Sequence, residues 1–169
     1  MGSQTFLTRA ASAIGSAISG GRNGSDDAHP PETFEVTRTP EEWRALLTPE
    51  QYSVLREEHT ERAGSSPLDK EQREGTFVCA ACDLPVFSSR DKFDSGTGWP
   101  SFTAPIADGV RTREDRGFLG TRVEVHCRRC GGHFGHVFDD GPPPTGLRYC
   151  MNGVALKFVL DAAAEASAP

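Results

Sequence analysis

Residues 121–138 read TRVEVHCRRCGGHFGHVF, and this stretch decides the class of fold. Within 121–127, three polar side chains alternate with three apolar ones: Arg122, Glu124 and His126 against Val123, Val125 and Cys127. A period of two is typical of a strand with one buried face. A turn with two cysteines and two glycines follows, and 133–138 has the pattern of a further strand. The stretch therefore predicts antiparallel strands around a cysteine-containing turn.

The composition of the whole chain agrees with a mainly β protein of one compact domain. Its 169 residues include 18 Gly and 12 Pro, which sit between short apolar runs and indicate many turns. The net charge of −6 gives no overall attraction to nucleic acid or to anionic lipid. No stretch approaches the roughly 18 to 20 consecutive apolar residues that cross a bilayer. We therefore expect a curled antiparallel β domain with neither nucleic acid nor a membrane as its partner.

Two short helices are expected before the strands begin. Thr39-Pro40-Glu41-Glu42 and Thr48-Pro49-Glu50-Gln51 each place a capping Thr before a Pro, with Glu or Gln three residues after the cap. The second helix should run to about Glu58, and the apolar residues of both helices should cover a sheet. Residues 59–75 are polar and predict a surface loop.

The two ends of the chain differ in composition from its middle. Residues 1–33 are rich in Ala, Gly, Ser and Asn and predict a disordered tail or a remnant leader. The apolar run is broken by Arg9, Ser12 and Ser16, which favours the tail and a cytoplasmic protein, with export or organelle import left open. The domain itself should span 34–161, with a flexible tail at 162–169.

The cysteines divide into two pairs and a singleton. Cys79 and Cys82 form one CxxC pair, and Cys127 and Cys130 form the other. Four thiolates on two chelating turns suit one tetrahedral structural Zn²⁺. Residues 83–126 separate the pairs, more than the ~15–20 residues of a zinc ribbon. Two disulfides, a CxxC redox pair, or His133 in place of one cysteine ligand are the alternatives.

Cys150 is the candidate reactive thiol. Alternation places Arg148, Cys150 and Asn152 on one face of a strand, and the same face continues through 154–160 as Val154, Leu156, Phe158 and Leu160. Tyr149 and Met151, on the other face, should pack into the second sheet. Because a neighbouring guanidinium favours the nucleophilic thiolate, Arg148 supports a catalytic role. The alternative is that Cys150 is a small buried hydrophobic residue.

Other candidate site residues surround this cysteine in the pattern. His136, Phe138 and Asp140 share one strand face, and His133 is offset from it by an odd step. The turn-rich loop 93–102, FDSGTGWPSF, presents Trp99 and Phe102 either as a lid over the core or as pocket walls for an apolar group.

Taken together, the motifs resemble those of the B-type methionine sulfoxide reductases, over about 35–160. The resemblance rests on TPEEW, LTPEQY, both CxxC pairs, FDSGTGWPSF, GGHFGHVFDDGP and GLRYCMNG, in that order. It implies two antiparallel sheets, in a sandwich or barrel-like arrangement, with short N-terminal helices. It also implies an enzyme that reduces the R epimer of methionine sulfoxide in oxidised proteins, so that 34–161 would be the reductase domain.

The resemblance assigns a role to each candidate residue. Cys150 would attack the sulfoxide sulfur and become a sulfenic acid, and His136, with His133 near it, would protonate the sulfoxide oxygen. Arg148 would favour the thiolate, while Asp140 and Asn152 would hold the histidines and the water network. Trp99 would pack against the S-methyl group, with Phe102 and Phe138 as further substrate-binding residues. The zinc ligands would be Cys79, Cys82, Cys127 and Cys130.

One position departs from the pattern of many relatives. They carry a resolving cysteine in the Gly-x-Gly before the tryptophan, where this chain has Thr97. The sequence therefore resembles a single-cysteine subtype, and thioredoxin, glutaredoxin or glutathione would reduce the sulfenic acid directly. We expect the protein to act as a monomer.

Three other functions compete with this one. A zinc-pinned β module that binds a small ligand or a protein partner would not need Cys150. A zinc ribbon on nucleic acid would use Arg128 and Arg129, but acidic residues interleave with the basic ones nearby. A different thiol chemistry, such as a peroxidase-like activity, would show no preference for sulfoxides.

Overall fold

The computed structural model describes residues 32–117 and 120–162. The predicted tail or leader at 1–33 and the predicted tail at 162–169 lie almost entirely outside the described residues. From Thr33 onward, the described residues form one compact unit. Within them, no helix has the length and hydrophobicity of a membrane span.

Both predicted helices are present with their predicted caps. α1 (Pro40–Leu46) follows Thr39 and α2 (Pro49–Glu57) follows Thr48, and each Thr forms a complete capping box. In each box the Thr side chain accepts from a main-chain N–H, and Glu42 or Gln51 accepts from the Thr N–H. α2 ends where Glu58 adopts the left-handed conformation, as a helix C-terminus commonly does.

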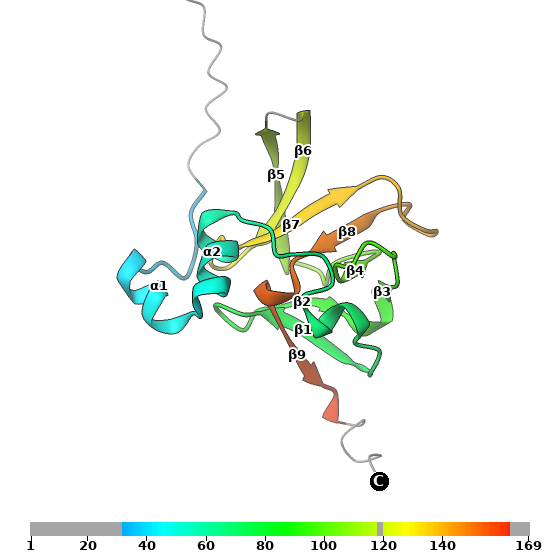
Figure 1. The fold of residues 1–169 in the computed structure, drawn as a ribbon, viewed down its shortest axis with the longest axis horizontal. Coiled ribbons are helices and arrows are strands. Elements are labelled where there is room, and N and C mark those ends of the chain that lie inside the picture. Colours follow the sequence, from blue (N-terminus) through cyan, green and yellow to red (C-terminus); the bar gives the residue numbers. More distant parts are fainter. Residues whose placement is uncertain (1–31, 118–119, 163–169) are drawn as a thin grey trace, which may run out of the picture. The chain divides into compact units, whose positions relative to one another are not determined.

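The strands form two antiparallel sheets, as expected (Figure 1). The three-stranded sheet has the order β2-β1-β9, and the six-stranded sheet has the order β3-β4-β8-β7-β6-β5. The strands are β1 (Gly75–Cys79), β2 (Pro85–Ser88), β3 (Lys92–Phe93), β4 (Ser101–Phe102), β5 (Val110–Gly117), β6 (Gly120–Cys127), β7 (His133–Phe138), β8 (Arg148–Met151) and β9 (Leu156–Leu160). Three short 3-10 helices complete the elements: η1 (Pro67–Lys70), η2 (Ser89–Asp91) and η3 (Gly153–Ala155). Neither sheet of the described residues closes on itself, so the predicted pair of antiparallel sheets is confirmed and forms no closed barrel.

The core lies between the two sheets and is rich in phenylalanine. Phe77 and Phe87 from the smaller sheet meet Phe102 from the larger one, with ring centroids 5.0 Å and 4.4 Å from that of Phe102. All three rings are fully buried, as is Met151 on β8. Tyr149 lies against Phe87 with centroids 5.9 Å apart. The prediction that Tyr149 packs against the second sheet is therefore confirmed, and Met151 is buried in the same core.

The pattern at 147–160 was wrong in one respect. Instead of one continuous face, β8 and β9 are separate strands in different sheets, with η3 between them. Alternation restarts after η3, so the inward side chains of β9 do not extend the face that carries Cys150. η3 is thus the place where the chain crosses from the larger sheet to the smaller one.

The half-buried strand predicted at 121–127 is also different in detail. β6 is exposed at its start and buried on both faces from Glu124 onward, so Glu124 and His126 are buried rather than solvent-facing. The second face is covered because the segment before α1 lies over it. The ring centroids of Phe34 and His126 are 5.9 Å apart. The polar face of β6 that carries Glu124 and His126 is therefore buried, so these side chains can form part of an internal site.

Candidate functional site

The central pair of the site lies on β7 and β8. Cys150 and His136 are directly opposite each other in this antiparallel pair, as are Arg148 and Phe138. Because opposite residues point to the same face of a sheet, these four side chains share one surface. On the other edge of β8, Cys150 is opposite Ser101 of β4.

A pocket of about 180 Å³ opens over this face. Its lining combines Cys150 and His136 with two aromatic side chains, three polar side chains, a glycine and a methionine: Trp99, Phe138, Thr60, Arg122, Asn152, Gly135 and Met151. A larger cavity, of about 930 Å³, lies between α2, the 59–67 segment and Val154, and has no cysteine in its lining. We place the candidate active site in the smaller pocket because Cys150, the candidate reactive thiol, lines it.

Gly135 allows β7 to approach β8 beside Cys150. A Cβ atom at this position would lie 2.1 Å from the carbonyl oxygen of Cys150, and the φ angle of +153° lies in a region that side chains rarely adopt. Only glycine fits this close contact without moving the backbone. The spacing of Cys150 and His136 therefore depends on a residue that carries no side chain.

The histidines come together because of a bulge in β7. His126 pairs with His133 and Val125 pairs with Gly135, so Phe134 is an extra residue on β7. His133 and His136 are three positions apart in the sequence, which would normally place them on opposite faces of the strand. The extra residue in the bulge brings both side chains to the same face, with ring centroids 5.4 Å apart. His133 is buried and does not line the pocket, whereas His136 does.

Two carboxylates that the sequence analysis did not select hold the histidines. His136 Nε2 donates to Asp115 Oδ2 at 2.8 Å, and His133 Nδ1 donates to Glu124 Oε1 at 2.7 Å. Asp115 also pairs with Arg122, and Glu124 with Arg113. Burial lowers the pKa of His136, and the hydrogen bond to Asp115 opposes this effect. The expectation that Asp140 and Asn152 hold the histidines is therefore wrong.

Asp140 holds Arg148 instead. Its two carboxylate oxygens accept from Arg148 Nε at 2.8 Å and from an Arg148 terminal nitrogen at 2.9 Å. The guanidinium carbon lies 4.5 Å from the centre of the Phe138 ring. A two-point ion pair and an aromatic platform thus fix the cation beside Cys150.

Asn152 is tied to main-chain groups. Its Nδ2 donates to the carbonyl oxygen of Phe134 at 2.9 Å, and its Oδ1 accepts from the N–H of Glu61 at 2.9 Å. The side chain is buried, so these bonds fix its orientation at the pocket.

The pKa of Cys150 is raised overall, whereas Arg148 alone would lower it. Burial raises the pKa of the thiol, while Arg148 and a hydrogen bond from Thr97 act to lower it. The thiol is half-buried, which makes desolvation of the thiolate the larger effect. Arg148 therefore offsets a penalty that the pocket itself creates.

Of the aromatic candidates, Trp99 and Phe138 line the pocket and Phe102 does not. Phe102 was wrongly taken as substrate-binding, because it stacks on Phe87 within the core. Alternation explains this position, since Ser101 is opposite Cys150 and its neighbour Phe102 must point to the other side.

The two CxxC pairs meet away from this pocket. The ligand atoms of Cys79, Cys82, Cys127 and Cys130 all lie within 4.8 Å of one another, close enough to hold a metal ion. In each pair the chain turns back on itself. The main-chain N–H of Asp83 donates to the carbonyl oxygen of Cys79, and that of Gly131 donates to the carbonyl oxygen of Cys127, both at 2.9 Å. Asp83 and Gly131 both adopt positive φ, so the two turns have matching shapes. All five cysteines are free, and His133 is not part of the group.

Comparisons with known proteins agree with this arrangement. The model of the SelR domain matches residues 47–160. A peptide methionine sulfoxide reductase MsrB of Leptospira interrogans is 52% identical over 126 residues, which cover 74% of this chain and 96% of that protein. An MsrB of Pseudomonas putida is 54% identical over 73% of this chain and 94% of its own length. An MsrB of Methanosarcina barkeri is also 54% identical, over 73% of this chain and 87% of its own. This chain therefore belongs to the SelR family, the B-type methionine sulfoxide reductases.

Proposed function

We propose that this enzyme reduces the R epimer of methionine sulfoxide in proteins and peptides, with Cys150 as the nucleophile. The observation that carries the proposal is the pairing of Cys150 with His136 across β8 and β7, inside a pocket walled by Trp99 and Phe138. A thiol and an acid on one face, beside an apolar wall, suit a substrate with a polar S=O group and an S-methyl group.

The chemistry transfers one oxygen atom from the substrate to the enzyme. The Cys150 thiolate attacks the sulfoxide sulfur and forms a sulfur–sulfur bond, while the sulfoxide oxygen takes up a proton and its bond to the substrate sulfur breaks. The oxygen then bonds to the Cys150 sulfur as the sulfur–sulfur bond breaks and leaves its electron pair on the substrate sulfur, so that Cys150 becomes a sulfenic acid and methionine is released. Cys150 is thereby oxidised by two electrons and the substrate sulfur is reduced by two.

His136 is the proposed proton donor. Its Nε2 is engaged by Asp115, which leaves Nδ1 as the ring nitrogen that can exchange a proton with bound substrate. His133, held by Glu124, lies beside it and would support its orientation and charge state. Arg148, fixed by Asp140, would stabilise the thiolate before the attack.

Trp99 and Phe138 are the proposed contacts of the S-methyl group. A rigid aromatic wall on one side of the sulfur and an acid on the other distinguish the two epimers, because only one places its oxygen toward the acid. Asn152 would hold the water network at the base of the pocket.

The four-cysteine cluster is the proposed site of one structural Zn²⁺. Tetrahedral coordination with Zn–S bonds of ~2.3 Å requires sulfurs that are ~3.8 Å apart. The Cys79 and Cys130 sulfurs are 3.7 Å apart and those of Cys82 and Cys127 are 3.5 Å apart, which fits this geometry. Four thiolates leave no open position, so the metal would stabilise the fold and take no part in the reaction.

An external thiol is the proposed reductant of the sulfenic acid. Four cysteines are assigned to the metal and Thr97 stands in the loop beside Cys150, so the described chain offers no second thiol at the pocket. Thioredoxin, glutaredoxin and glutathione are the candidate reductants, and we expect the enzyme to act as a monomer. The five free thiols suit a reducing compartment, and a cytoplasmic location and a reductase domain spanning 34–161 remain predictions.

A substitution at Thr97 tests the absence of a resolving thiol. In the Thr97→Cys variant, one turnover should produce a disulfide between residues 97 and 150. Two free thiols at these positions after oxidation would contradict the proposed geometry.

A single turnover without reductant tests the reaction itself. Mixed with a peptide sulfoxide, the enzyme should release one equivalent of methionine peptide, and a sulfenic acid probe should label Cys150. Methionine formation by the Cys150→Ser variant would contradict the proposal and favour a different chemistry. No methionine formation by either protein would favour the binding-module hypothesis.

A further inference from the structure

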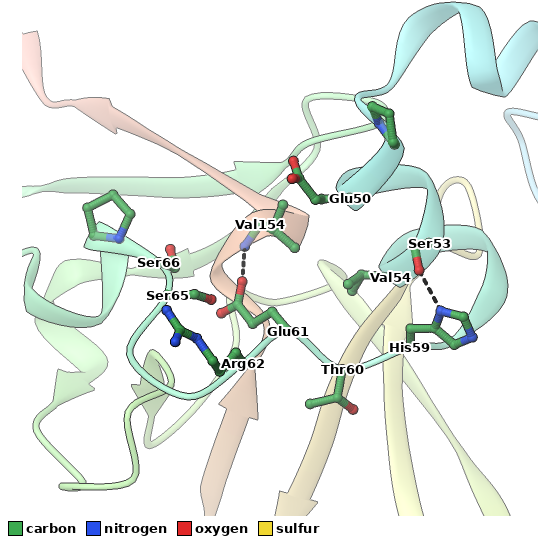
Figure 2. A pocket seen from close by; sticks show the side chains of 12 residues that line it. Glu50, Ser53, Val54, His59, Thr60, Glu61, Arg62, Ser65, Ser66 and Val154 are labelled. Carbon is green, nitrogen blue, oxygen red and sulfur yellow. Dashed lines mark hydrogen bonds between the residues drawn. The ribbon is translucent and has the colours of Figure 1, made fainter.

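The loop between α2 and η1 contains a half-buried carboxylate that the reaction scheme does not use. Glu61 lies at the edge of the larger cavity, and its side chain reaches from the loop toward η3 (Figure 2). Oε1 accepts from the N–H of Gly153 at 2.7 Å, and Oε2 accepts from the N–H of Val154 at 2.9 Å. The carboxylate thus holds two main-chain donors at the point where the chain leaves β8.

The main chain of the same residue contacts the active-site pocket. The Glu61 carbonyl oxygen accepts from Trp99 Nε1 at 3.1 Å, and the Glu61 N–H donates to Asn152 Oδ1 at 2.9 Å. Trp99 and Asn152 both line the pocket that contains Cys150. One residue therefore connects the start of η3 with two pocket side chains.

The loop is bonded to the loop that carries Trp99 at a second point. Residues 62–65 are exposed, and the Gly64 N–H donates to Gly98 at 2.7 Å as a second tie to the Trp99 loop. Burial raises the pKa of Glu61, while the hydrogen bonds from Val154 and Gly153 lower it, so the carboxylate is held in place at a cost in solvation. A buried carboxylate is stable only while its hydrogen-bond donors, here the N–H groups of Gly153 and Val154, remain within bonding distance.

We propose that Glu61 is a positioning residue for the sulfoxide pocket. Its carboxylate, bound to the start of η3, holds the loop so that the loop main chain fixes the Trp99 indole and the Asn152 amide. It does not touch the substrate and acts through Trp99. This inference rests on the proposed function only for the identity of the substrate that Trp99 contacts.

A measurement without substrate tests directly whether the Glu61 side chain fixes the Trp99 indole. The chain has two tryptophans, so a ¹⁵N-labelled sample gives two indole N–H resonances, which the Trp99→Phe variant assigns. In Glu61→Ala, the Trp99 resonance should shift and exchange with solvent about tenfold faster, and that of Trp43, buried on α1, should stay unchanged. No change at Trp99 would overturn the proposal. Equal changes at both tryptophans would also overturn it, because they indicate general loosening.

Substrate discrimination provides the second test. If Glu61 places Trp99 against the S-methyl group, its loss should weaken the preference for a methyl over an ethyl sulfoxide in otherwise identical peptides. We expect this ratio of kcat/KM values to fall several-fold in Glu61→Ala and less in Glu61→Gln, which keeps one accepting oxygen. Glu57→Ala, an exposed control at the end of α2, should keep the wild-type ratio.

This ratio does not depend on the fraction of folded enzyme, so a purely structural role would leave it unchanged. A wild-type ratio in Glu61→Ala would contradict the proposal. If the wild-type enzyme reduced neither sulfoxide, the proposed function would fail, and the tryptophan resonances would still decide the role of Glu61.

Discussion

Cys150 on β8 lies directly opposite His136 on β7, so the thiol and the imidazole leave the larger sheet on the same face. The register of these strands, rather than proximity in sequence, brings them together. Burial acts on both groups toward their neutral forms, because it raises the pKa of Cys150 and lowers that of His136. The nearby charges of Arg148 and Asp115 oppose this effect on each group.

The first prediction concerns the proton donor. His136→Gln should lower kcat about 10²- to 10⁴-fold, the usual contribution of general acid catalysis, and leave the alkylation rate of Cys150 by iodoacetamide nearly unchanged. His59→Gln, which alters an exposed histidine bonded to Ser53, is the control and should keep wild-type kcat. A kcat within twofold of wild type in His136→Gln would contradict the assignment.

The second prediction concerns the charge beside Cys150. Arg148 lowers the pKa of Cys150 against the effect of burial, so Arg148→Gln should raise that pKa further. The pH midpoint of Cys150 alkylation should therefore move to higher pH, and activity at neutral pH should fall. Arg116→Gln, which removes an exposed arginine of β5, should leave the midpoint in place. A shift to lower pH in Arg148→Gln would show that the account of the charge is wrong.

The third prediction concerns the glycine at the strand contact. Gly135→Ala places a methyl group 2.1 Å from the Cys150 carbonyl oxygen, so β7 and β8 must separate. We expect a loss of about 2 kcal/mol or more in the free energy of unfolding, measured with urea, together with a fall in kcat. Gly117→Ala, whose new methyl group would lie 4.0 Å from the nearest printed neighbour among the described residues, the Gly120 carbonyl oxygen, is the matched control. Unchanged stability of Gly135→Ala would mean that the strands are further apart than described here.

The fourth prediction concerns the buried carboxylate at His133. Burial would raise the pKa of Glu124, but hydrogen bonds from His133 and Arg113 leave it below the ordinary value of 4.5. A lowered pKa in the folded state adds stability above pH 4.5 that is lost as the pH falls through the folded-state value. Glu124→Gln should therefore cost more free energy of unfolding at pH 7 than at pH 4. An equal cost at both pH values would show that the charge of Glu124 is unimportant.

The fifth prediction concerns the metal. The purified protein should contain one zinc per chain, and Cys79→Ser should lose the metal and fail to fold stably. Structural zinc sites supply ~10–16 kcal/mol, which equals or exceeds the ~5–15 kcal/mol total stability of a domain. Cys150→Ser should keep both the metal and the melting temperature. A wild-type protein whose melting temperature stayed the same after its metal was removed would contradict the assignment.

Local patterns predicted the elements well. Thr39 and Thr48 determine where the helices begin through contacts within three residues, and both capping boxes are present as expected. The CxxC pairs likewise carry their spacing in the sequence, so the cluster of four cysteines could be anticipated.

Contacts between distant strands could not be predicted in this way. Asp115 and Glu124 were missed because their roles depend on the register of β5, β6 and β7 and on the bulge at Phe134. Charged residues on a hairpin normally face solvent, and no signal in 110–127 shows that a second layer covers Glu124. Phe102 was misplaced for a related reason, since only its pairing with Tyr149 shows which side of β4 faces the core. Glu61 lies in a polar loop whose pattern gives no indication of its four hydrogen bonds.

Whether Cys150 reduces one epimer of methionine sulfoxide can be decided with a racemic substrate. The purified protein is incubated with a racemic methionine sulfoxide peptide and dithiothreitol, beside a Cys150→Ser control, and the remaining epimers are separated by chromatography. The account predicts that only the R epimer disappears and that the control consumes neither. Consumption of the S epimer, consumption by the control, or no consumption at all would contradict it.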